Sequence, residues 1–224
     1  MVRGCEGIPS DIEKLAGAET LAEAWQKCED GHELIRLCGA MVGTEGWPTR
    51  QEILLVVCNC AETVLPYLPK EETRSRECVR VSRLWAEGKA TVEEITEAGR
   101  IAVCALGVSD GRFPFPPEGK STIGRLPSGV PWCWAATAAY SVAYAASFAA
   151  DADAHRDAGR DDAASNSSFA FMCITNSVPY FAALFLADAA GAEGSTVRRN
   201  ALSESLKKMA DLVRARLHPT AWEI

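Results

Sequence analysis

The chain has 224 residues, of which 48% are hydrophobic and 24% are charged, so it is long enough to bury a sizeable core within one domain. Its formal net charge of −7 disfavours general binding to nucleic acid or to an anionic membrane and suits a basic partner. The nine cysteines are odd in number and scattered, unlike a secreted disulfide framework. The stretch MVRGCEGIPSDIEK has no apolar signal core, and we expect a cytoplasmic protein.

Four capping boxes predict that the first half of the chain, residues 10–106, is helical. In each, a Ser or Thr is followed three residues later by Glu, so the hydroxyl can accept from a backbone amide while the Glu reaches back. The pairs are Ser10/Glu13, Thr20/Glu23, Thr49/Glu52 and Thr91/Glu94. Pro66 and Pro69 end one helix and Gly88 ends another. We expect helices over residues 11–16, 20–29, 32–42, 50–65, 71–87 and 92–105.

The segment LLVVCNCAE places Cys58 and Cys60 two residues apart within one predicted helix. Their side chains then lie about 200° apart and cannot hold one metal ion together. Because free cysteine is commonly buried as a small hydrophobe, we predict that both are packing residues. Cys28, His32 and Cys38 form a better ligand set, but no Cys-x-x-Cys pair accompanies them. We therefore predict neither a metal site nor a cofactor.

Residues 107–131 interrupt the helices, because they contain five glycines and five prolines in 25 positions. Loops of this length are uncommon and are usually functional or disordered. This one carries four apolar residues that a free linker would not need, and we expect an ordered strap across the helices. The apolar residues are Phe113, Phe115, Ile123 and Leu126. The stretch GKST is no phosphate-binding loop, since Pro114 replaces the required glycine and no strand precedes it.

The second half of the chain, residues 132–217, is also predicted to be helical. In its alanine-rich first part, Tyr140, Tyr144 and Phe148 recur every four residues, which favours packing in the core. A last helix is expected near 196–217. The apolar stretch 169–190 includes a proline and three consecutive polar residues, so we interpret it as buried in protein rather than in a membrane. These elements predict a single all-α domain, 1–224. We expect a compact multi-helix bundle or a short helical array, with the long Pro/Gly-rich loop between its halves.

The most unusual polar stretch is DADAHRDAGRDD. Asp153, Asp157 and Asp161 recur every four residues, which would place them on one face of a helix, and Asp162 follows them. Such a stripe is a solvated surface, a partner-binding face or a divalent-metal site. Residues 132–194 carry seven acidic and two basic residues. An acidic partner-binding face formed by these four aspartates would attract a basic protein.

Three segments resemble a known protein family. They are LLVVCNCAETVLPYLPKEETRSRECVRVSRLWAEGKATVEEITEAGRIA (54–102), AWQKCEDGHELIRLCGAM (24–41) and SLKKMADLVRARL (205–217). Together they cover just over a third of the chain and are similar to the immunity proteins of bacterial polymorphic toxin systems. That resemblance implies an all-helical bacterial protein that binds and neutralises a toxin without catalysis. The loop over 107–131 departs from the family pattern, and the resemblance assigns no catalytic residue.

The sequence therefore supports two functions from different classes. The leading one is a non-enzymatic protein that binds a protein partner, with no nucleic acid and no membrane involved. The alternative is a small-molecule enzyme or ligand-binding protein with an apolar pocket between the two helical halves. That pocket would be lined by Trp132, Trp134, Tyr140, Tyr144 and His155. A flat acidic surface would favour binding, whereas an enclosed cavity with His or Asp pointing inward would favour chemistry.

Overall fold

A computed structural model of the chain describes residues 20–68, 70–105, 133–190 and 195–220. The described residues contain no strand, which confirms the all-α prediction. Besides a 3₁₀ turn, η1 (Leu65–Tyr67), they form the following helices: α2 (Leu21–Lys27), α3 (Gly31–Ala40), α4 (Arg50–Glu62), α5 (Thr73–Ala86), α6 (Val92–Ala105), α7 (Cys133–Asp157), α8 (Asp161–Ala189) and α9 (Ser195–Arg214). The expected helix over 11–16, the strap over 107–131 and Trp132 lie outside the described residues.

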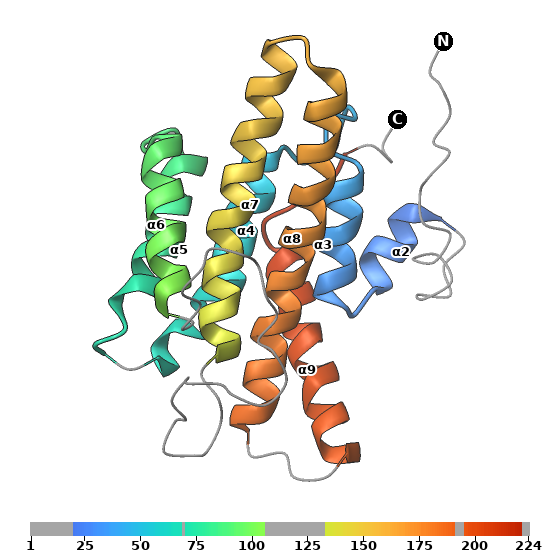
Figure 1. The fold of residues 1–224 in the computed structure, drawn as a ribbon. Coiled ribbons are helices and arrows are strands. Elements are labelled where there is room, and N and C mark those ends of the chain that lie inside the picture. The colour runs from blue at the N-terminus through green and yellow to red at the C-terminus, as the bar shows by residue number, and fades with distance from the viewer. Residues whose placement is uncertain (1–19, 69, 106–132, 191–194, 221–224) are drawn as a thin grey trace.

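The helices surround a long central hairpin formed by α7 and α8 (Figure 1). On one side, α3 and α9 pack against α8; on the other, α5 and α6 pack against α7. Helix α4 contacts both members of the hairpin. The end of the hairpin where α7 meets α8 projects beyond its neighbours. Helices from both sequence halves thus contribute to one hydrophobic core.

The capping residues explain where the helices begin. Thr49 accepts from the Glu52 amide while the Glu52 carboxylate accepts from the Thr49 amide at 2.8 Å, which completes the predicted capping box. Thr91 and Glu94 make the same reciprocal pair at the start of α6. Thr20 caps α2 through the Glu23 amide. Helix α4 ends at Glu62, three residues earlier than expected, because the chain tightens into η1 around Pro66.

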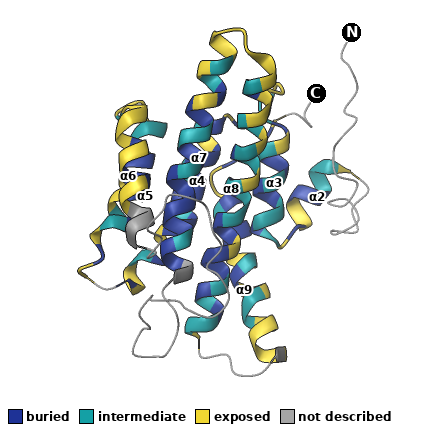
Figure 2. Ribbon diagram, in the orientation of Figure 1, coloured by how far each residue is buried: buried dark blue, intermediate teal, exposed yellow. Residues whose placement is uncertain are grey.

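Small residues let α7 lie close to its neighbours. Most of the alanines between Ala135 and Ala152 are buried, and Figure 2 shows the buried face running along the helix. Tyr140 is buried and its ring centroid lies 4.4 Å from that of Tyr144, which packs against the core with Phe148. The aromatic stripe is core packing, as predicted.

The cysteine prediction is confirmed for the pair that the sequence singled out. Cys58 and Cys60 are both fully buried. Burial raises the pKa of the Cys60 thiol to about 12, and that of Cys58 is raised further for the same reason. Cys78, from α5, donates a hydrogen bond to the Ala139 carbonyl of α7 at 3.3 Å. These thiols therefore act as small core side chains.

Helix α8 is buried on one face only. Phe171, Val178 and Phe185 lie in the core, whereas Phe169 and Tyr180 are exposed. By length and composition α8 could cross a membrane, and 44% of its most apolar stretch is buried. Core helices pass the same test, so this property alone is weak evidence for a span. The expected burial of 169–190 thus holds for the inner face of the helix.

Candidate functional site

The tip of the α7–α8 hairpin carries the acidic residues that the sequence singled out. Helix α7 ends at Asp157, and the chain turns at Gly159, whose φ is 66°. The Arg160 amide closes the turn by donating to the His155 carbonyl at 2.9 Å. Asp161 then begins α8. The aspartates therefore do not form one helical stripe as expected, because a glycine in the left-handed region ends the first helix.

Asp153 is committed to an internal network. Its carboxylate accepts from Nη1 of Arg50 at 2.7 Å, and the Arg50 side chain is only 5% exposed. Nη2 of Arg50 donates to Oγ of Ser168, also at 2.7 Å, which links α4 to both hairpin helices. Burial lowers the pKa of Arg50, and the charge of Asp153 opposes that shift. Arg156 also approaches Asp153, at 3.9 Å. The Asp153 carboxylate therefore holds α4 against the hairpin and is not free to bind a partner in the way an exposed, unpaired carboxylate is.

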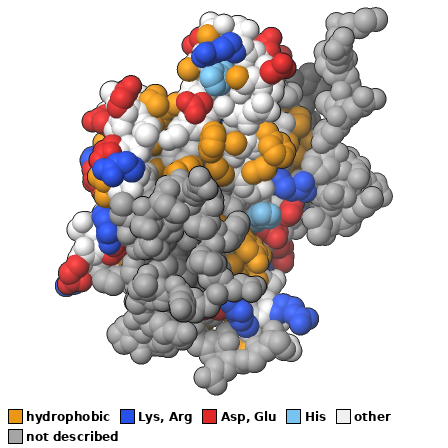
Figure 3. All heavy atoms as spheres, in the orientation of Figure 1, with side chains coloured by type: hydrophobic (Ala, Val, Ile, Leu, Met, Phe, Trp, Pro, Cys, Tyr) orange, Lys and Arg blue, Asp and Glu red, His pale blue; other side chains and the backbone are white. Residues whose placement is uncertain are grey.

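The other three acidic residues are differently placed. Asp157, Asp161 and Asp162 are exposed, and within the described ranges none has a basic group within 4.0 Å. Asp161 and Asp162 occupy the first turn of α8, where the helix dipole favours negative charge. We call these three residues the acidic tip. Figure 3 shows charged side chains gathered around this end of the molecule.

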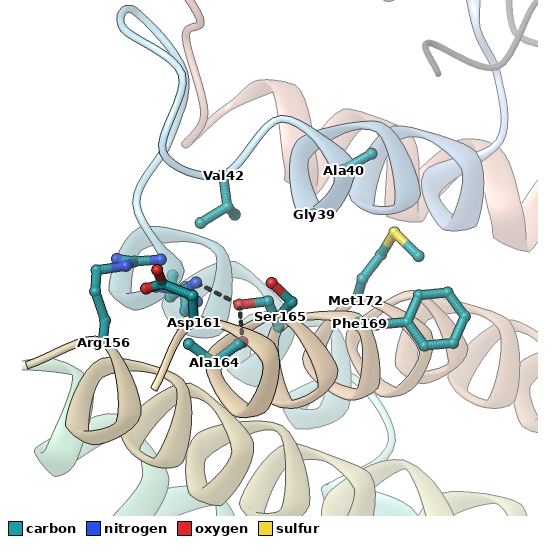
Figure 4. A pocket seen from close by; sticks show the side chains of 11 residues that line it. Gly39, Ala40, Val42, Arg156, Asp161, Ala164, Ser165, Phe169 and Met172 are labelled. Carbon is teal, nitrogen blue, oxygen red and sulfur yellow. Dashed lines mark hydrogen bonds between the residues drawn. The ribbon is translucent and has the colours of Figure 1, made fainter. Parts of the chain in front are cut away.

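A cleft of about 470 Å³ adjoins the acidic tip, between the end of α3 and the first turns of α8. Figure 4 shows Arg156 and Asp161 at one end of this cleft and Phe169 and Met172 at the other, with Val42, from the turn after α3, across from Asp161 and Ser165. The cleft is largely open to solvent. Its lining residues are Gly39, Ala40, Val42, Arg50, Arg156, Asp161, Ala164, Ser165, Ser168, Phe169 and Met172.

The residues proposed for an apolar pocket do not come together as one group. Tyr140 and Tyr144 are adjacent and face the core. His155 lies at the other end of α7, about 16 Å from Tyr144 along the helix axis, with its Nδ1 buried and unpartnered. The side chain of Trp134, like Trp132, lies outside what the structure describes. In the described part, His155 and the tyrosines thus belong to different sites.

Cys28, His32 and Cys38 are engaged separately. The Cys28 thiol lies 3.5 Å from the Asp30 carbonyl, and Cys38 is fully buried. Nδ1 of His32 donates to the Asn176 carbonyl of α8 at 2.6 Å, since a carbonyl oxygen only accepts. Within the described residues, no three His, Cys, Asp or Glu side chains are grouped to hold a metal ion.

Sequence reasoning did not find Arg50, Phe169, Met172 or Val42. Arg50 begins α4, Val42 lies in the turn after α3, and Phe169 and Met172 belong to α8, three segments that only the tertiary fold brings together. No protein-family model, curated protein or solved structure matches the chain. The residues of the acidic tip and of the adjoining cleft are therefore what the chain itself offers for an inference about function.

Proposed function

We propose that this chain is a non-enzymatic bacterial protein that binds a basic protein partner through the acidic tip and so neutralises a toxin. The observation that carries the proposal is the set of three exposed carboxylates, Asp157, Asp161 and Asp162, which are free of ion pairs within the described residues. The resemblance to immunity proteins supports the choice of a toxin as the partner.

The position of the acidic tip supports a role in encounter. The hairpin end projects beyond the neighbouring helices (Figure 1), so a large partner can reach it without displacing core elements. The field of three nearby carboxylates would raise the association rate of a basic protein, because long-range attraction steers diffusional encounter. Arg156 and Arg160 moderate the field and would exclude partners of the wrong charge pattern.

The adjoining cleft supports binding more than catalysis. It is open to solvent, whereas small-molecule sites usually enclose most of the ligand surface. Its charged groups also offset one another, since Asp153 neutralises Arg50 and Asp161 lines the same end of the cleft as Arg156. A shallow surface of mixed character is typical of a protein–protein interface.

The test is coexpression of the chain with each protein encoded beside its gene. We expect one such protein to arrest growth when expressed alone, growth to recover when the chain is present, and the two to form a complex of defined mass on size-exclusion chromatography with light scattering. Changing Asp157, Asp161 and Asp162 together to Asn should weaken that complex.

A charge-matched control separates local recognition from total charge. Glu93→Gln, Glu97→Gln and Glu204→Gln remove the same net charge at exposed positions on α6 and α9 and should leave the complex intact. The proposal is wrong if no neighbouring gene product forms a complex with the chain, or if both triple variants weaken the complex equally.

A further inference from the structure

The cleft beside the acidic tip has an apolar half, at the end that Phe169 and Met172 line. Phe169 is 64% exposed, the largest exposure among the large hydrophobic side chains of the described residues. Met172 lies one helical turn further along α8 and points toward Gly39 and Ala40 of α3 (Figure 4). An aromatic side chain this exposed, at the edge of a concave surface, is typical of an interaction site.

Glycine shapes the floor of the apolar half. A Cβ added at Gly39 would lie 3.0 Å from Cγ of Met172, closer than ordinary van der Waals contact. The absence of a side chain there lets α3 and α8 approach closely beneath the cleft. Ala40 also lines it and has the next-smallest side chain. This close contact forms the floor of the cleft, and the cleft volume of about 470 Å³ above it leaves room for a side chain of a partner.

The charges around the cleft select the chemistry of the partner. Inside it, Arg50 is neutralised by Asp153 at 2.7 Å, so the buried cation offers little to an incoming anion. Asp161 lines the cleft at the hairpin end, and the exposed Asp157 and Asp162 lie on the same hairpin turn, at the end of α7 and in the first turn of α8. Arg156 and Arg160 offset part of this negative charge. The three aspartates and two arginines together leave a net charge of −1 at this end of the hairpin.

We propose, resting on the function proposed above, that the partner inserts one apolar side chain into the cleft against Phe169 and Met172 and places flanking Lys or Arg residues against the acidic tip. An apolar centre surrounded by a polar rim is the usual anatomy of a protein interface. The two parts have separate kinetic roles. The buried anchor sets how slowly the complex dissociates, whereas the rim sets how fast it forms.

The first experiment uses defined peptides in place of the partner. The probe is acetyl-Lys-Lys-Leu-Trp-Lys-Lys-amide, and its control, acetyl-Lys-Lys-Ser-Ser-Lys-Lys-amide, has the same charge without the apolar residues. Binding is followed through the Met172 methyl resonance and by isothermal titration. We expect the apolar peptide to bind saturably and to shift Met172, and the control peptide to bind at least about tenfold more weakly.

Two variants test the role of the exposed ring. Phe169→Asp should weaken the apolar peptide by about tenfold or more, because an interface anchor typically contributes that much. Val197→Asp is the matched control, since Val197 is 56% exposed on α9, away from the cleft, and should change affinity less than about twofold. Circular dichroism and urea unfolding check that both variants fold. Equal binding of the two peptides, no binding of either, or an unchanged affinity in Phe169→Asp would overturn the inference.

The outcomes also separate this inference from the proposed function. If a neighbouring gene product is neutralised and its dissociation rate is unchanged by Phe169→Asp, the cleft plays no part although the proposed function stands. If the apolar peptide occupies the cleft but no neighbouring product is bound, the cleft binds basic apolar segments and the toxin assignment is wrong.

Discussion

Arg50 shows how a single residue ties the hairpin to the rest of the molecule. Its side chain is 5% exposed, and its Nε has no partner among the described atoms. Its charge therefore depends on Asp153 and Ser168 for compensation. The sequence could not predict this network, because Arg50 and Asp153 are 103 residues apart and no local pattern links the two residues.

Asp153→Ala is expected to lower the free energy of unfolding by about 1–3 kcal/mol, because it leaves a buried guanidinium without its counterion. Asp157→Ala, four residues later but exposed and without an ion pair in the described part of the chain, should change it by less than about 0.5 kcal/mol. Urea unfolding measures both. Equal small effects would show that Arg50 reaches water when Asp153 is removed.

Gly31 and Gly99 provide a matched pair for the packing of the helices. A Cβ at Gly31 would lie 2.5 Å from Cβ of Met209 and 2.7 Å from the Ala210 amide, so Gly31→Ala must push α9 away from α3. A Cβ at Gly99 would meet Ala143 at 3.5 Å, an ordinary contact.

We expect Gly31→Ala to destabilise the fold by about 1–3 kcal/mol. Gly99→Ala should instead stabilise it by about 0.5–1 kcal/mol, since alanine is the better helix former. Thermal unfolding distinguishes the two signs. Stabilisation by both substitutions would mean that α9 is held less closely than the structure shows.

Thiol chemistry offers a prediction about individual cysteines. Among the six whose environment is described, Cys173 is exposed and the other five are buried. Burial raises the pKa of the Cys78 thiol to about 12 and also raises that of Cys173, though less of its surface is covered. Since the thiolate is the reactive form and its fraction grows as pH rises toward the pKa, alkylation of Cys173 should speed up between about pH 7 and about pH 9.

Peptide mapping after brief iodoacetamide treatment is the measurement. Cys173 should be modified in the native protein, whereas Cys28, Cys38, Cys58, Cys60 and Cys78 should react only after urea is added. Rapid native modification of Cys58 or Cys60 would contradict their assignment as core residues.

At the scale of the helix, local chemistry predicted most of what the structure shows. The capping pairs at Thr20, Thr49 and Thr91 each begin a helix, and Gly88 follows the end of α5. Local chemistry failed where two signals competed. The four-residue spacing of the aspartates favoured one continuous helix, but Gly159 adopts a φ of 66° and ends α7 first. The termination signal was present in the sequence as the Gly beside an Arg-Asp-Asp run.

The caps themselves can be tested by substitution. Thr49→Ala and Thr91→Ala should each lower the free energy of unfolding by about 0.5–2 kcal/mol, because each leaves a backbone amide at a helix start without its acceptor. Thr96→Ala is the control: its hydroxyl bonds back to the Val92 carbonyl within α6, and alanine is preferred inside a helix. Urea unfolding should show little change or a slight gain for that variant.

At the scale of the whole molecule, the fold class followed from local patterns but the site did not. Periodicity and caps establish which segments are helical; they do not establish which helices touch. The cleft exists because the turn after α3 meets the first turns of α8, two segments more than 100 residues apart in the sequence. The sequence predicted that Phe169 is buried, because it begins the apolar stretch 169–190. Phe169 is instead exposed, because α8 lies at the surface of the bundle and only its inner face is covered.

The ionic strength of the solution should separate the two parts of the proposed interface. At about 0.1 M salt the Debye length is about 10 Å, so added salt screens the acidic tip from an approaching partner. We expect the association rate of the partner to fall as NaCl rises from about 50 mM to about 500 mM. Changing Asp157, Asp161 and Asp162 to Asn should slow association at low salt and flatten that dependence, with little effect on dissociation. Phe169→Ser should instead speed dissociation and leave the association rate and its salt dependence unchanged, because it removes the apolar anchor without altering the charges that steer encounter. Stopped-flow kinetics measure both rates, and a salt dependence that is identical in the wild type and the triple Asn variant would show that the acidic tip is a solvated surface.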